Sequence, residues 1–216
     1  MKKYNIFFLI IIVPFSVIYG QSLPYEITLC TGYTTGLKIA GISFSQAPYD
    51  ESSITFPGGV IYGISVDAPI SKTMQLELEC LGRNTKTTID TVYRFSPISS
   101  VNGIGNYNSN VIYLYAGFCK NFVINHLEIP FFGYGIGGQF LNSPESLRFF
   151  MPYLELQLGA KSFTTKIIGF RFQGEMLLSP FGGNLANGTL PAAAFVQFGV
   201  TVGIVFEIHR QSLPNN

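Results

Sequence analysis

The residues that could carry chemistry in this chain are two histidines, a glycine-rich run and a set of charged side chains at every second position. His126 and His209 are the only imidazoles, and imidazole is the usual group for acid–base catalysis near neutral pH and for metal binding. Two histidines are too few for a zinc site unless carboxylates complete it, and neither H-E-x-x-H nor C-x-x-C spacing occurs. We therefore expect no metal site, no cofactor and no enzyme.

The glycine-rich run matches the dinucleotide-binding pattern G-x-G-x-x-G at Gly133, Gly135 and Gly138. That pattern binds a pyrophosphate only where a strand leads into a helix through the glycines. The residues that follow, Gln139 to Pro144, end in a loop signal instead of a helix. The run is therefore interpreted as glycine packing within a strand.

Charged residues alternate with apolar residues in several segments, as in Leu154-Glu155-Leu156-Gln157-Leu158. A period of two predicts a strand, because successive side chains point to opposite faces. A soluble sheet turns its apolar face to a core, whereas a lipid-embedded barrel turns that face outward and its polar face to the lumen. We expect these residues to form a polar network in such a lumen: Lys38, Glu77, Glu79, Glu155, Lys161, Arg171, Glu175 and Glu207.

This network has two interpretations. Its members satisfy one another and plug the barrel, because a small barrel is just wide enough for side chains to fill. Alternatively they line a path for a solute or a proton, since charges within a membrane are often functional. The first interpretation is favoured, and glycines such as Gly159 and Gly199 would leave room for the larger partners.

The elements that must position these residues are about eight strands of the length of a tilted membrane strand. The final segment illustrates the pattern, with Val196, Phe198, Val200 and Val202 on one face. Pro130 is expected to disturb the fifth segment, which could be bulged. The predicted strands cover residues 27 or 33 to 42, 59–67, 73–83, 110–120, 126–140, 153–161, 168–178 and 196–208.

Composition supports one domain that faces lipid through strands. The chain has 216 residues, of which 47% are hydrophobic and 12% charged. After the first twenty residues no apolar run is long enough for a membrane-spanning helix. The net charge of +1, without a basic cluster, gives no sign of a nucleic-acid partner. Residues 1–20 have a charged start and an apolar stretch and are expected to be a signal peptide, which leaves 21–216 as the barrel domain.

With its signal peptide, alternating strands and apolar final strand, the chain resembles the small outer-membrane β-barrel proteins of the OmpA/OmpX-like, porin-family class. The resemblance implies an all-β fold, a single antiparallel up-and-down transmembrane barrel in the cell outer membrane. It also implies outer-membrane lipids as surroundings and the barrel-assembly machinery as a partner during biogenesis. One departure is visible, because members of the class usually end on an aromatic residue, whereas here Phe206 is followed by residues 207–216.

The predicted connections alternate between short and long, which is typical of outer-membrane barrels with tight periplasmic turns and extended outer loops. Both termini are then expected in the periplasm. Residues 68–72, 121–125 and 162–166 form the short set, and residues 45–57, 84–109, 141–150 and 179–191 the long set.

Three hypotheses about function follow. In the first, the barrel has a structural or surface-interaction role carried by its long outer loops, especially residues 84–109, with an unknown extracellular ligand. In the second, it is a narrow pore or conduit for small solutes, hydrophobic ones included. In the third, it is a soluble exported β-barrel or sandwich with an apolar interior.

Overall fold

The computed structural model describes residues 24–44, 49–96, 99–122, 128–142, 148–185 and 188–208. The expected signal peptide, His126 and His209 lie outside these residues. Nearly all of the described chain is strand, and none of it forms a helix that could cross a membrane. The strands are β1 (Tyr25–Thr34), β2 (Leu37–Phe44), β3 (Tyr49–Phe56), β4 (Gly59–Pro69), β5 (Met74–Ser96), β6 (Ser99–Asn121), β7 (Glu128–Asn142), β8 (Arg148–Phe163), β9 (Ile168–Leu185) and β10 (Gly188–Ile208).

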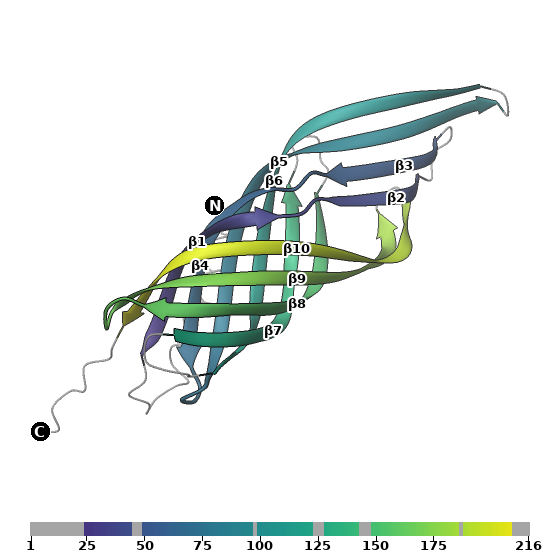
Figure 1. Ribbon diagram of the computed structural model, residues 1–216. Helices are drawn as coiled ribbons and strands as arrows, with labels where there is room; N and C mark the ends of the chain where they lie inside the picture. Colours follow the sequence, from purple (N-terminus) through teal and green to yellow (C-terminus); the bar gives the residue numbers. More distant parts are fainter. Residues whose placement is uncertain are drawn as a thin grey trace, which may run out of the picture.

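These strands form one closed antiparallel barrel (Figure 1). Each barrel strand pairs with its neighbour in sequence, and β1 closes the sheet by pairing with β10 from Tyr25↔Ile208 to Thr34↔Gly199. The strands β2 and β3 continue β1 and β4 beyond the barrel, so the ten strands of the described chain make an eight-stranded cylinder. The expected all-β, up-and-down barrel is confirmed.

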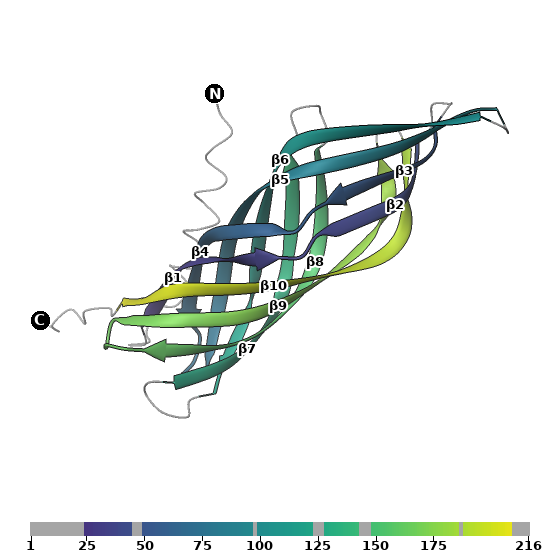
Figure 2. The same ribbon diagram turned by 45° about the horizontal axis from the view of Figure 1, so that its top comes forward.

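The two ends of the cylinder differ. At one end, called the short-turn end, residues 70–73 and 164–167 join neighbouring strands tightly. At the other, called the extended end, β2, β3 and the distal halves of β5 and β6 project together past the barrel (Figures 1 and 2). The long β5 and β6 each have 23 residues, about twice the 9 to 11 that cross a bilayer.

The long connections expected from the sequence are therefore largely strand. Within the segment 84–109, β5 and β6 stay paired from Asn84↔Asn110 to Ser96↔Ser99. Likewise β9 and β10 pair up to Gly188↔Leu185. The loop prediction was wrong here. These segments are rich in threonine, serine, asparagine and glycine, but an antiparallel ladder accommodates such residues when each strand has a paired neighbour.

The break between β1 and β2 lies beside the break between β3 and β4. Gly36 and Gly58 face each other there, and a Cβ built on Gly58 would lie 2.7 Å from the Thr34 carbonyl oxygen. A Cβ on Gly36 would lie 2.6 Å from the Phe56 carbonyl oxygen. Because only glycine allows backbones to approach this closely, these residues let both strands bend at one level.

Pro130 lies near the short-turn end of β7, one residue before the last β6 pair, Asn121↔Phe131. The register with β8 runs without a shift through Pro130↔Ala160. The expected bulge is absent from this pairing. The proline lies just past the last β6 pair, where it needs to donate no ladder hydrogen bond, and its carbonyl oxygen accepts from the Phe122 N–H at 2.7 Å.

Candidate functional site

The candidate site is the lumen, which side chains from all eight barrel strands fill. At the short-turn end Lys161 is fully buried and lies among acidic groups. Its Nζ donates to Glu26 Oε2 at 2.5 Å, to Asp67 Oδ2 at 2.8 Å and to Gln75 Oε1 at 2.8 Å. Gln75 Nε2 in turn donates to Glu26 Oε1 at 2.6 Å. All three ammonium protons therefore have oxygen acceptors, which a buried lysine needs.

Arg171 extends this network from β9. Its guanidinium pairs with Glu77 Oε1 at 2.7 Å and with Asp67 Oδ2 at 3.1 Å. It also donates to Gln157 Oε1 at 3.3 Å and lies 4.5 Å from the centroid of the Phe131 ring. Asp67 thus joins Lys161 to Arg171, and the ionic cluster ties β4, β5, β8 and β9 together across the lumen.

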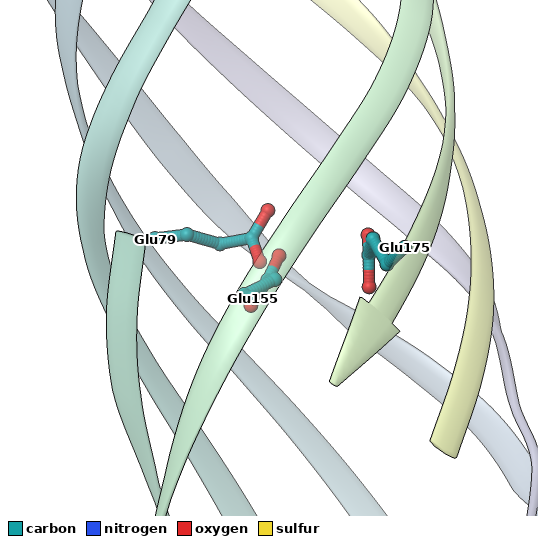
Figure 3. A group of neighbouring side chains, drawn as sticks. All are labelled: Glu79, Glu155 and Glu175. Atoms are coloured by element: carbon teal, nitrogen blue, oxygen red, sulfur yellow. The ribbon is translucent and has the colours of Figure 1, made fainter. Parts of the chain in front are cut away.

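A second acidic cluster lies beside this network, towards the middle of the barrel. Glu79 on β5, Glu155 on β8 and Glu175 on β9 have carboxylate oxygens within 4.8 Å of one another, and all three are buried. Figure 3 shows the three side chains reaching into the barrel from separate strands. Neutral donors orient two of them: Gln157 donates to Glu155 at 2.8 Å, and Gln173 and Thr201 donate to Glu175 at 2.6 and 3.0 Å.

Towards the extended end the lumen becomes mostly apolar, although Arg83, Gln139 and Gln197 are also buried there. The hydrophobic inward side chains of this part pack into one buried cluster: Leu37, Ile39, Ile54, Phe56, Ile61, Leu81, Val111, Tyr113, Tyr115, Leu141, Met151, Tyr153 and Leu177. Two lumen cavities, one beside the acidic cluster and one beside Arg83, each have a volume of about 10 Å³. Such a volume holds about one water, so side chains fill the lumen at both of these places.

Tyrosines on the lumen side pack over glycines in the wall. A Cβ on Gly137 would lie 2.3 Å from Tyr153 Cζ, and one on Gly135 would lie 2.7 Å from Tyr115 Cε2. These glycines belong to the run that matched the dinucleotide pattern, and they lie within the strand β7. Their role is to accept the rings, as glycines covered by aromatic side chains do in sheets.

The structure brings six of the eight expected lumen residues inside the barrel, where each is at most 6% exposed: Glu77, Glu79, Glu155, Lys161, Arg171 and Glu175. Glu207 is half-buried at the end of β10, on the same face as the buried Val205. Lys38 is exposed and does not belong to the network.

The error at Lys38 has a local cause. In β1 the buried residues have even numbers: Glu26, Thr28 and Thr34. In β2 the buried residues have odd numbers: Leu37 and Ile39. The break at Thr35 and Gly36 shifts the alternation by one residue, and such a shift moves every following side chain to the opposite face.

The predicted network left out three buried charged residues: Glu26, Asp67 and Arg83. The alternation of side chains along β4 and β5 places Asp67 and Arg83 on the inward face, so it was sufficient to include both. Glu26 precedes the predicted start of its strand and gave no signal.

The outer face carries the apolar side chains. Ile136 and Leu158 are each 66% exposed and Phe172 is 57% exposed, whereas Glu77 on the inner face is 0% exposed. An exposed apolar belt around a charged interior is the arrangement of a barrel immersed in lipid. It contradicts the hypothesis of a soluble barrel or sandwich.

Comparison with solved structures agrees with this geometry. The outer membrane protein OprG from Pseudomonas aeruginosa superposes with a TM-score of 0.58 at 11% identity, over 88% of this chain and 99% of that one. The chain has the fold of the small outer-membrane β-barrel proteins. Neisserial surface protein A superposes with a TM-score of 0.52 at 8% identity, over 85% and 97% of the two chains. No family model and no curated protein matches the sequence.

Proposed function

We propose that this chain is an integral outer-membrane barrel that acts at the cell surface through the sheet at its extended end. The fold of its structural neighbours and the exposed apolar belt support the membrane location. The short turns then face the periplasm and the extended end faces the exterior, as the alternation of connections indicates.

One observation carries the interaction role. Residues 99–109 of β6 pair with β5, whereas the pairing of β6 with β7 begins only at Asn110↔Asn142. Within the described chain, the other edge of this segment has no neighbouring strand. An edge of this kind presents backbone N–H and C=O groups to which an extended peptide can add as a further strand. The proposed ligand is therefore a protein segment in extended conformation.

The packing of the lumen supports the interaction role over the pore hypothesis. The ionic cluster and the apolar cluster follow one another along the barrel, and two cavities among their side chains have volumes of about 10 Å³. A hydrated ion or a small metabolite needs a continuous path wider than this. Purified protein in planar lipid bilayers is expected to show no stepwise conductance.

The test of the interaction role is to shorten the β5–β6 hairpin. Removing residues 89–105 and joining Thr88 to Asn106, which form a cross-strand pair, through an Asn-Gly turn deletes residues 99–105 of the free edge and keeps the barrel. The deletion also removes the β5 residues that pair with residues 49–54 of β3. The β3 edge that this exposes carries Asp50 and Glu51, and charged residues on an edge oppose the addition of a strand. The shortened chain is expected to retain heat-modifiable gel migration and to lose attachment of displaying cells to surfaces and to other cells. Unchanged attachment, or conductance steps from the full chain, would refute the proposal.

A further inference from the structure

The lumen holds more acidic than basic groups. Among the described residues, six acidic side chains are buried (Glu26, Asp67, Glu77, Glu79, Glu155 and Glu175) and three basic ones (Arg83, Lys161 and Arg171). Burying an uncompensated charge is strongly unfavourable, even after the surroundings relax. The interior of this barrel therefore needs further positive charge, either as protons or as a cation.

The excess is concentrated at Glu79, Glu155 and Glu175. Lys161 and Arg171 make their ion pairs with Glu26, Asp67 and Glu77. No lysine or arginine in the described part of the chain pairs with the three clustered carboxylates. The donors that reach them, from Gln157, Gln173 and Thr201, are neutral. They orient the carboxylates without neutralising them.

A separate feature points into the same place. Tyr113 on β6 is 4% exposed, and its hydroxyl has no hydrogen-bond partner among the described residues. Its side chain lines the cavity of about 10 Å³ that the three glutamates also line. Leaving a buried hydroxyl without a hydrogen-bond partner is unfavourable, so this cavity offers a place for a ligand to be bound by the hydroxyl and the carboxylates together.

The chemistry of the donors defines the ligand. All of the candidate ligand atoms are carboxylate or hydroxyl oxygens, which select hard cations such as Ca²⁺, Mg²⁺ or Mn²⁺. Ca²⁺ binds six to eight oxygens at about 2.3 to 2.6 Å and accepts bidentate carboxylates, whereas Mg²⁺ usually keeps several waters. Each of the three carboxylates places one oxygen within 4.8 Å of the other two, and each can add its second oxygen by bidentate coordination. The cavity has room for only about one water-sized sphere.

We infer that Glu79, Glu155 and Glu175, with the Tyr113 hydroxyl, bind one Ca²⁺ in the middle of the lumen. The ion joins β5 to β8 and β9 across the barrel, beside the salt bridges of Lys161 and Arg171. Because side chains fill the lumen around these carboxylates, the ion is taken up while the barrel folds. The proposal departs from the expectation of no metal site, which considered histidine and cysteine patterns alone.

The experiment measures Tb³⁺ as a substitute for Ca²⁺. The full chain is refolded from urea into detergent micelles after EDTA treatment, with increasing Tb³⁺ and excitation of tyrosine. The chain has no tryptophan, and Tyr113 and Tyr153 line the cavity, so a bound ion receives energy from tyrosine. One equivalent of Tb³⁺ per barrel is expected to saturate the emission, and Ca²⁺ present during refolding is expected to suppress it.

Variants separate this site from surface binding. Glu155→Gln is expected to lower Tb³⁺ affinity by roughly tenfold or more, and Glu128→Gln, whose residue is exposed, is expected to leave the affinity unchanged. Tyr113→Phe removes the hydroxyl, keeps the ring and is expected to weaken Tb³⁺ binding. This variant takes the place of Glu155→Gln in the experiment if Glu155→Gln does not fold. Ca²⁺ is also expected to raise the urea midpoint of the wild-type chain and not that of Glu155→Gln.

Two outcomes would overturn the inference. The first is Tb³⁺ emission from the wild-type chain that does not saturate at one equivalent, or Tb³⁺ emission from Glu155→Gln that is as strong as that of the wild-type chain. The second is a wild-type urea midpoint that is the same with Ca²⁺ and with EDTA, which would assign the neutralising role to protons. Neither outcome bears on the surface role, because the β5–β6 extension lies outside this part of the lumen.

Discussion

At the residue scale, removing one partner of an ion pair in the lumen is expected to destabilise the barrel. Arg171 compensates both Asp67 and Glu77, and Lys161 compensates both Glu26 and Asp67. Removing one partner of a buried pair leaves an uncompensated charge in a medium that solvates it poorly. The stability of the barrel should therefore be most sensitive at the basic members, which are fewer.

Arg171→Met is expected to lower the free energy of unfolding by roughly 3 to 5 kcal/mol, since it leaves Glu77 without its cation. The measurement is urea unfolding in micelles at neutral pH, followed by gel migration. Lys166→Met removes a cation from an exposed turn and should change stability by less than about 0.5 kcal/mol. Adding Glu77→Gln to Arg171→Met should restore part of the lost stability. Equal losses of stability in Arg171→Met and Lys166→Met would contradict the buried ion pair.

At the element scale, the wall of β7 depends on glycines that admit the tyrosines of β6 and β8. The lumen-facing Gly135 and Gly137 have aromatic atoms of Tyr115 and Tyr153 where a Cβ would stand. The rings are also enclosed by the opposite wall, since both tyrosines are only 3% exposed. They have little space into which to move.

Gly137→Ala is expected to cost roughly 1 to 3 kcal/mol, because the new Cβ forces a buried ring or the backbone to shift. Its Cβ would lie 2.3 Å from Tyr153 Cζ and 2.5 Å from the Leu114 carbonyl oxygen. Gly174→Ala is the matched control, since its nearest heavy atom would be 3.9 Å away. Thermal unfolding of both variants in micelles compares them, and an equal loss in the two would show that Tyr153 does not pack against Gly137.

At the scale of the whole molecule, the barrel is an inverted soluble protein. The apolar belt turns outward because lipid, unlike water, carries no penalty for meeting it, and the ionic network turns inward because lipid cannot solvate charge. The loss of stability caused by a charged substitution on the outer face should therefore depend on the depth of the residue in the bilayer and not on its exposed fraction.

Phe172 and Ile167 test this dependence, because each is 57% exposed. Phe172 lies within β9 on the outer face, whereas Ile167 lies in the turn before it. Phe172→Arg is expected to cost roughly 2 to 4 kcal/mol in lipid vesicles, and Ile167→Arg at most about 1 kcal/mol. Refolding into vesicles from urea gives both free energies. Equal costs would contradict the immersion of this face.

The sequence by itself determined which side chains share a face, because the alternation of a strand is a local property of the backbone. It therefore placed Glu77, Glu155 and Arg171 on one face and Leu156 and Phe172 on the other. The alternation could be followed only as far as the next break in a strand. At Gly36 the inward face changes from even-numbered to odd-numbered residues, so Lys38 was assigned to the wrong face.

Only the tertiary structure decided which inward residues meet. Glu79, Glu155 and Glu175 come from three strands, and they converge because closure of the cylinder and the register between strands bring them to the same level. The same closure joins Lys161 to Glu26, which are 135 residues apart in the chain. Register and closure are cooperative properties of all the strands together, so no single segment of the sequence encodes these contacts.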